Sequence, residues 1–115
     1  LANGRVLVTG GSESSYSGTR NLASAELFDP VAGTWTAAAS LPRSMIFHAS
    51  TSLPGGSVLV TGVIGLLYDS ASDTWRPTDA VRVERYGNTA TLLHDGSVLA
   101  AGGYDRNTSS YPRSV

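Results

Sequence analysis

Five side chains suited to ligand binding fall at two places in the chain. They are Arg43, His48, Arg82, Arg85 and Tyr86. The guanidinium group of an arginine presents a rigid fork of N–H donors that matches carboxylates and carbonyls. We therefore predict a ligand-binding site at these residues. The alternative is structural, with Arg43 and Arg85 donating to backbone carbonyls of adjacent structural units and His48 acting as a hydrogen-bonded strand histidine.

Catalytic and metal chemistry find little support in the residue types. The chain has no cysteine and only two histidines, His48 and His94, which fall at the ends of different segments. Two such histidines make a poor zinc site. Asp29 and Asp69 precede turn residues, where a carboxylate ordinarily accepts backbone N–H groups. No Gly-x-Ser-x-Gly nucleophile elbow is present. We expect no catalytic residue, no metal and no cofactor.

Charge and length exclude several classes of protein. The chain has 115 residues and a formal net charge of -1, and only 15% of its residues are charged. A nearly neutral chain makes a nucleic-acid partner unlikely. Apolar runs such as 63–67 are far shorter than the roughly 20 residues of a membrane span, so we expect no membrane insertion. All eight basic residues are arginine. Together with abundant Ala, Gly and Ser, this composition suggests a GC-rich bacterial source.

Internal repeats organise the whole chain. Three stretches align without gaps, each a short apolar run that follows a glycine and leads to a further glycine: 4–11, 56–63 and 96–103. Two further pairs lie 40 residues apart, 25–30 with 65–70 and 33–35 with 73–75. The first unit carries extra residues between Gly11 and Ala25. This Ser-, Gly- and Asn-rich stretch, 12–24, is predicted to form a long surface loop.

The repeated segments have the character of short β-strands. The runs after the glycines are apolar and bounded by turn residues, as expected of strands buried on both faces. The segments around Trp35 and Trp75 alternate polar and aromatic residues, so one face of each is predicted to be buried. A further segment precedes each of the later glycine-led strands, at 47–53 and 86–93, and Gly-Gly or Asp-Gly turns join the two. We predict an all-β chain with four strands per unit, and both tryptophans packed in the core or between units.

These motifs together resemble the kelch repeat. A double glycine after an apolar strand, then an aromatic-Asp pair, then a tryptophan six or seven residues later, is the family's pattern. The residues that carry it are Gly10, Gly11, Phe28, Trp35, Gly62, Tyr68, Trp75, Gly102 and Gly103. Segment 85–96 is also similar to the opening strand of blades in bacterial kelch proteins and the galactose-oxidase-like group. The second unit departs from the pattern, because Val63 follows Gly62, and Asn88 stands where the family often has histidine.

The resemblance implies a partial β-propeller built from antiparallel four-stranded blades, about two and a half in number. Blade one would hold its last three strands within 4–42, blade two would span 43–82, and blade three would hold its first two strands within 83–115. An open array leaves apolar faces and strand edges uncovered. Three interpretations stay open: a fragment of a full propeller, copies that associate to complete a ring, and a stand-alone partial propeller.

The resemblance also shapes what the chain is expected to do. It places Arg43, His48, Arg82, Arg85 and Tyr86 toward the rim of a central channel, where propellers often hold ligands. We expect a non-catalytic module that binds a protein or a glycan through this rim and its loops, 12–24 and 104–114 among them. The alternatives are a fragment of a copper radical oxidase and a purely structural repeat. The oxidase cofactor requires a cysteine, which this chain lacks. Bacterial kelch proteins of this kind are often exported, so we expect an extracellular or cell-envelope location.

Overall fold

The computed structural model describes residues 1–79, 81 and 83–111. Within these ranges every regular element is a β-strand. The strands are β1 (Val6–Thr9), β2 (Ser12–Ser15), β3 (Gly18–Asn21), β4 (Ala25–Asp29), β5 (Thr34–Ala38), β6 (Ala49–Ser52), β7 (Ser57–Thr61), β8 (Gly65–Asp69), β9 (Thr74–Thr78), β10 (Thr89–Leu92) and β11 (Val98–Ala101). The all-β prediction is therefore confirmed. None of the described residues belongs to a helix long and apolar enough to cross a membrane.

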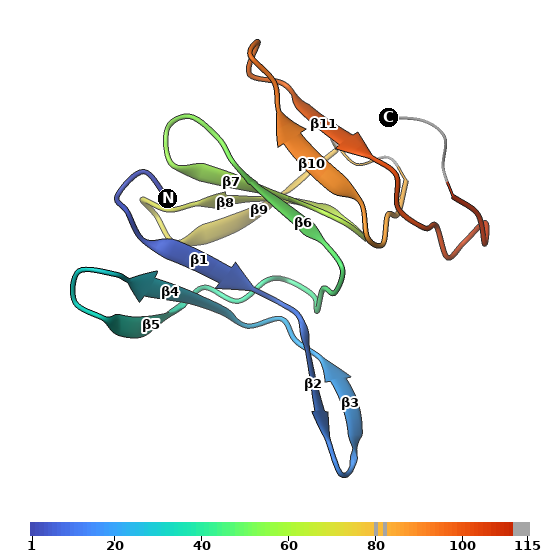
Figure 1. Ribbon diagram of the computed structural model, residues 1–115, viewed down its shortest axis with the longest axis horizontal. Helices are drawn as coiled ribbons and strands as arrows, with labels where there is room; N and C mark the ends of the chain where they lie inside the picture. Colours follow the sequence, from blue (N-terminus) through green and yellow to red (C-terminus); the bar gives the residue numbers. More distant parts are fainter. Residues whose placement is uncertain (80, 82, 112–115) are drawn as a thin grey trace.

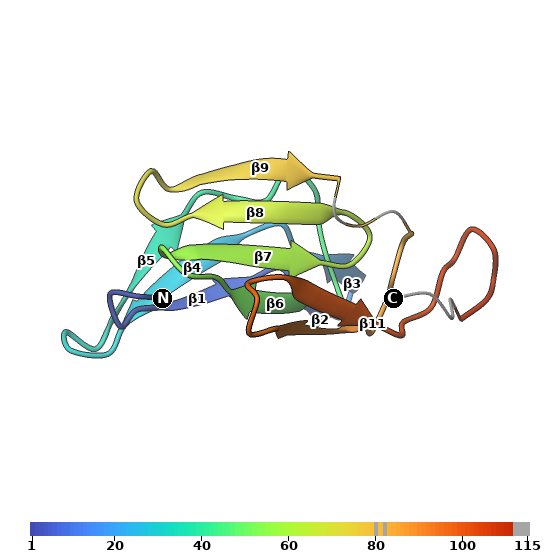
Figure 2. The same cartoon turned by 90° about the horizontal axis from the view of Figure 1, so that it is seen from above.

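Three antiparallel sheets lie side by side like consecutive blades (Figure 1). The middle sheet has four strands in the order β6-β7-β8-β9, as the repeat predicts. On one side of it stands the three-stranded sheet β1-β4-β5, and on the other the pair β10-β11. The molecule is flat, only 20 Å along its shortest axis, and Figure 2 shows the strands of the middle sheet one above another, from β9 at the top to β6 below. The arrangement is an open, propeller-like array.

The core lies in the seam between the first two sheets. Its buried members come from both sides: Ala25, Leu41, Met45, Val58, Val60, Leu66 and Tyr68. Pairing register explains why these residues meet. Val58, Tyr68 and Trp75 stand opposite one another on β7, β8 and β9, so they share the face turned toward the first sheet. Burial of this shared apolar face is what binds one sheet to the next.

A polar clamp reinforces this seam at Ala39. The indole Nε1 of Trp75 donates to the carbonyl oxygen of Ala39 at 2.7 Å, and the backbone N–H of Ala39 donates to Asp73 Oδ1 at 2.9 Å. The hydroxyl of Tyr68 donates to the same oxygen of Asp73 at 2.9 Å. Burial, reinforced by the Asp73 carboxylate, raises the pKa of Tyr68 to about 12, so this phenol stays a donor at physiological pH. Side chains of the second sheet thus bind both the backbone N–H and the backbone carbonyl oxygen of Ala39, at the end of the first sheet.

The equivalent tryptophan of the first sheet is placed differently. Trp35 packs on Phe28 with ring centroids 4.9 Å apart, as Trp75 packs on Tyr68 at 4.8 Å. Yet Trp35 is 55% exposed, whereas the expectation was that both tryptophans pack in the core or between units. The physical reason is that no described sheet covers the outer face of β1-β4-β5. Val6 and Val8 are exposed beside it.

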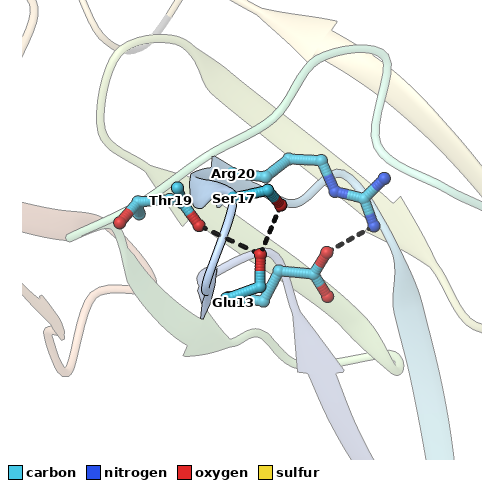
Figure 3. A pocket seen from close by; sticks show the side chains of 6 residues that line it. Glu13, Ser17, Thr19 and Arg20 are labelled. Atoms are coloured by element: carbon cyan, nitrogen blue, oxygen red, sulfur yellow. Dashed lines mark hydrogen bonds and ion pairs between the residues drawn. The ribbon is translucent and has the colours of Figure 1, made fainter.

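The insertion in the first unit is a β-hairpin, so the prediction of a long loop at 12–24 is wrong. Strands β2 and β3 pair antiparallel and project away from the blades (Figure 1). Cross-strand side chains stabilise the hairpin, since Arg20 forms an ion pair with Glu13 at 2.6 Å (Figure 3). The hydroxyls of Ser14 and Thr19 also lie 3.1 Å apart. Cross-strand pairs of this kind stabilise neighbouring strands. The turn residues in 12–24 gave no sign of these pairs, and the sequence therefore indicated a loop.

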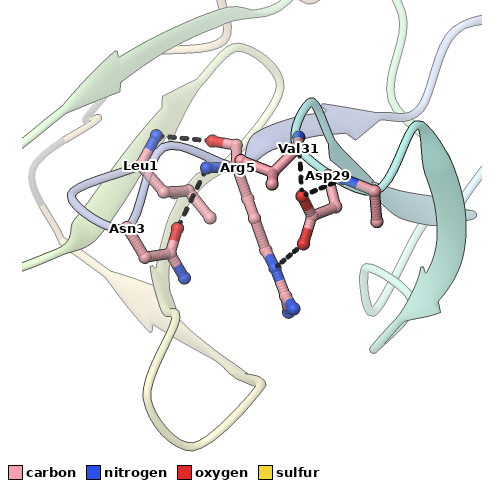
Figure 4. Close-up of polar contacts among 6 residues, drawn as sticks. Leu1, Asn3, Arg5, Asp29 and Val31 are labelled. Carbon is pink, nitrogen blue, oxygen red and sulfur yellow. Dashed lines mark hydrogen bonds and ion pairs between the residues drawn. The ribbon is translucent and has the colours of Figure 1, made fainter.

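The aspartates after the aromatic residues close turns, as predicted. Asp29 Oδ1 accepts the backbone N–H groups of Val31 and Ala32 at 2.9 and 3.1 Å, and its other oxygen lies 3.4 Å from Arg5 Nε (Figure 4). Asp69 accepts the N–H of Ala71 at 2.8 Å in the same way. These backbone donors hold the pKa of both carboxyls below the usual range. Both aspartates therefore serve structure.

The double glycine has a different form in the second unit. Gly10 and Gly11 adopt positive φ angles of 59° and 93°, and Gly102 and Gly103 adopt 71° and 92°. Val63, by contrast, is buried, with 8% of its surface exposed. Only three residues separate β7 from β8, so the chain turns directly into the next strand. The departure seen in the sequence thus reflects a tighter connection.

Candidate functional site

A shallow apolar hollow lies beside the segments that lead into β6 of the second sheet and β10 of the third sheet. Its walls are five side chains: Ile46, Phe47, Tyr86, Tyr104 and Arg106. We call this hollow, which has a volume of about 260 Å³, the aromatic cradle. Ile46 and Phe47 precede β6, Tyr86 precedes β10, and the remaining two follow β11. Three segments that are distant in sequence therefore build it.

Backbone hydrogen bonds hold these segments together. Tyr86 and Tyr104 exchange both N–H···O bonds, at 3.0 and 2.9 Å. The N–H of Gly87 donates to the carbonyl oxygen of Phe47 at 2.7 Å. The side chains of the cradle are thus fixed by main-chain pairing, which leaves their outer surfaces available to a ligand.

One cationic side chain borders the cradle. The guanidinium carbon of Arg106 lies 5.1 Å from the centroid of the Tyr86 ring, within the range of a cation–π contact. Arg106 is exposed, and Phe47 is 70% exposed. The cradle therefore combines accessible aromatic faces with a guanidinium group, an arrangement suited to an apolar ligand that also carries an acceptor.

The predicted ligand-binding residues are separated by the structure. Tyr86 lines the cradle. Arg85 is buried and its Nη1 donates to the carbonyl oxygen of Gly102 at 2.8 Å, the structural role that the sequence left open, here with a carbonyl of its own sheet. Arg43 is exposed and does not line the cradle. Arg82 lies outside the described residues.

Sequence reasoning missed four members of the cradle, which are Ile46, Phe47, Tyr104 and Arg106. It identified 104–114 only as a contact segment. A signal for Phe47 was available, because position 47 aligns with Gly87 in the 40-residue repeat. An aromatic residue in place of a glycine is the kind of departure that a repeat comparison can detect.

His48 belongs to a polar bridge between sheets. Its Nε2 lies 3.0 Å from Thr9 Oγ1 of the first sheet. At the equivalent position of the next seam, Asn88 Nδ2 donates to Thr61 Oγ1 at 2.8 Å. His48 Nδ1 and Asn88 Oδ1 are buried without a protein partner. His48 lies immediately before β6 and links two sheets through its hydrogen bond to Thr9, which is the kind of structural role that the sequence offered as the alternative.

Because of this burial, we expect the stability of the protein to depend on His48 in mildly acidic solution. Burial lowers the pKa of His48 from its usual value of 6.5. Below pH 6.5 the unfolded chain binds this proton more readily than the folded one, so the free energy of unfolding should fall as pH decreases through that range. The slope for one proton cannot exceed about 1.4 kcal/mol per pH unit. Urea denaturation between pH 5 and 8 measures it.

The matched control for this experiment is His48→Asn, which installs the residue of the equivalent seam. Asparagine can donate to Thr9 as Asn88 does to Thr61, but it does not titrate. The variant should lose most of the pH dependence between 5 and 6.5. An unchanged slope in His48→Asn would contradict the assignment.

Metal ligation has no counterpart in the described part of the chain. No group of three His, Cys, Asp or Glu side chains there is close enough to hold a metal ion. His94 is exposed in its turn, far in sequence from His48. The residues present therefore do not fit a copper or zinc centre.

Comparisons with known proteins agree with this geometry. Residues 2–42 match the Kelch motif. An F-box/kelch-repeat protein of Arabidopsis thaliana is 30% identical over 77 residues, which is 67% of this chain and 20% of that protein. A fungal alcohol oxidase of the AA5 family, solved in complex with copper, superposes with a TM-score of 0.78 at 20% identity, covering 96% of this chain and 27% of the oxidase.

The three sheets are thus propeller-type blades, a fold that the chain shares with the oxidase. Residues 2–42 therefore carry a Kelch motif, and two thirds of the chain is similar to a kelch-repeat protein. The chain spans only about a quarter of the length of these two relatives.

Proposed function

We propose that this kelch chain is a non-catalytic module that binds a protein or glycan through its loops and the rim of its inner strands. The observation that carries the proposal is the aromatic cradle, in which the exposed Phe47 and the partly buried Tyr86 and Tyr104 converge from three segments beside an arginine. Kelch repeats generally mediate protein interactions, which favours a protein ligand. Exposed aromatic residues and arginine are also the side chains most enriched at binding hot spots.

A second surface supports the same proposal. The β2–β3 hairpin stands away from the blades, and both of its strands are exposed along their whole length. Tyr16 at its tip is fully exposed. Protruding loops carried on a rigid scaffold are where binding residues concentrate. The hairpin would extend the contact beyond the cradle.

Parallel peptide and glycan arrays test the proposal. We expect a reproducible set of peptides or glycans to bind the wild-type protein, with signals reduced about tenfold by Arg106→Ala or by Tyr16→Ala, as for loss of one hot-spot side chain. Which variant loses signal tells which surface is used. Blank arrays of both kinds would contradict a binding module and favour a purely structural repeat.

An enzymatic role is the second candidate, because the structural neighbour is an alcohol oxidase in complex with copper. The residues of this chain do not supply a comparable centre, since it has no cysteine and its described part holds no metal-ligating cluster. Titration with copper distinguishes the two candidates. Tight stoichiometric copper binding by this chain would overturn the non-catalytic proposal.

The proposal extends to assembly and location. Uncovered faces on the outer sheets would allow copies to associate and complete a propeller, and light scattering on a sizing column measures the native mass. A mass of two or three chains supports that association, and a mass of one chain contradicts it. We also propose an extracellular or envelope location in a bacterial source, on the composition alone.

A further inference from the structure

Phe47 adopts a backbone conformation that an aromatic residue normally avoids. Its φ angle is +52°, in the left-handed region. Bulky side chains are rare there because Cβ crowds the following carbonyl. The equivalent residue of the next unit is Gly87, with φ at +73°. The repeat therefore demands a positive φ at this position, and glycine meets the demand without strain.

The Phe47 side chain gains little packing in exchange. It is 70% exposed and does not belong to the hydrophobic core. An aromatic residue that is both strained and solvent-exposed lowers the stability of the free protein in two ways. Strain of this kind, where it is observed, is a reason to look for function. Phe47 also lines the aromatic cradle, next to Tyr86, Tyr104 and the guanidinium group of Arg106.

We propose that Phe47 is the principal contact residue of the cradle, and that the cradle takes a proline beside an acidic residue in an extended segment of a partner protein. This inference rests on the proposed binding function and names its ligand. The proline ring would lie against the faces of Phe47, Tyr86 and Tyr104. The neighbouring carboxylate would pair with the exposed guanidinium group of Arg106, which lies beside the Tyr86 ring.

Three properties of the cradle favour proline over a sugar. Its walls are almost wholly apolar, so they offer few partners for the hydroxyl groups of a glycan. Its volume of about 260 Å³ suits one or two side chains and is below that of ordinary small-molecule sites. A proline-rich segment in the polyproline II conformation keeps its backbone solvated and docks on aromatic grooves without needing polar walls. The exposed cation at the edge adds charge complementarity to an acidic neighbour.

Fluorescence anisotropy with a labelled ten-residue peptide that contains Pro-Pro-Ala-Glu provides the test, together with thermal unfolding of each variant. We expect Phe47→Gly to raise the melting temperature by about 3 °C, because strain is relieved, and to weaken peptide binding at least tenfold. Changing both prolines of the peptide to alanine should weaken binding to wild type similarly. Arg106→Gln should remove the preference for Glu over Gln in the peptide.

Tyr16→Gly is the matched control, since it removes an equally exposed aromatic residue whose backbone is not in the left-handed region. It should bind the peptide as wild type does and show no rise in melting temperature. A Phe47→Gly variant with a lower melting temperature than wild type, or with unchanged affinity for the peptide, would overturn the role of Phe47. If the wild-type protein does not bind the peptide, the proposed class of ligand is wrong.

The outcome also separates this inference from the broader proposal. Array ligands that bind equally to wild type and Phe47→Gly would leave the binding function intact and remove the cradle from it. Glycan hits that depend on Phe47 would keep the residue's role and contradict proline as the ligand. Blank arrays together with no binding of the peptide would contradict both the binding function and the proposed proline ligand.

Discussion

Gly10→Ala is expected to destabilise this protein more than any other single methyl addition to its glycines. A Cβ atom at position 10 would lie 2.5 Å from the backbone carbonyl oxygen of Met45, and the φ angle there is +59°. Backbone cannot yield as a flexible side chain can, because Gly11 N–H donates to that same carbonyl at 2.8 Å. Left-handed strain and overpacking should together cost about 3 kcal/mol in the free energy of unfolding, measured by urea denaturation.

Gly102→Ala is the matched control for that change. Gly102 occupies the same place in the repeat, with φ at +71°, but nothing lies within 4 Å of the added Cβ. It should therefore cost only the conformational part, about 1 kcal/mol. The difference between the two variants isolates the close approach of Gly10 to Met45. Equal losses of stability would show that the contact carries no energy of its own.

Trp75→Ala is expected to have the second large effect. The Trp75 ring packs on the buried Tyr68 and against the core cluster, and its indole N–H donates to the carbonyl of Ala39 across the seam. Truncation removes the ring contacts and leaves that carbonyl without its donor. Because Trp75 is half-buried rather than fully buried, we expect a loss of about 3 kcal/mol, at the lower end for tryptophan truncation.

Trp35→Ala supplies the comparison in the same chain. Trp35 keeps the aromatic contact to Phe28 but is largely exposed, so its truncation should cost about 1 kcal/mol or less. Chemical denaturation of both variants under one set of conditions checks the difference. Similar losses would mean that the seam between the first two sheets contributes less than its contacts indicate, or that Trp35 is covered in solution by a second copy. Light scattering separates these two explanations.

The sequence by itself was enough for the strands of the blades and their order, but not for the β2–β3 hairpin, where it indicated a loop. Glycines around short apolar runs, the aromatic-Asp pairs and the tryptophans identified the strands of the blades, because these residue types encode local turns and strand faces. The roles of Asp29 and Asp69 followed as well, since a carboxylate before a turn bonds N–H groups two or three residues away. The absence of cysteine and the scarcity of histidine also limited the expected catalytic and metal chemistry from the sequence alone.

Only the tertiary structure decided what depends on neighbours from other units. Trp35 and Trp75 occupy equivalent positions of the repeat. The first sheet packs against Trp75, whereas no described sheet covers Trp35, which stays largely exposed. Arg85 proved to be buried against a carbonyl, while Phe47 came together with Tyr104 and Arg106 from a distant segment of the chain. Burial and convergence arise from how the blades stack, and the sequence pattern of a single repeat does not contain that information.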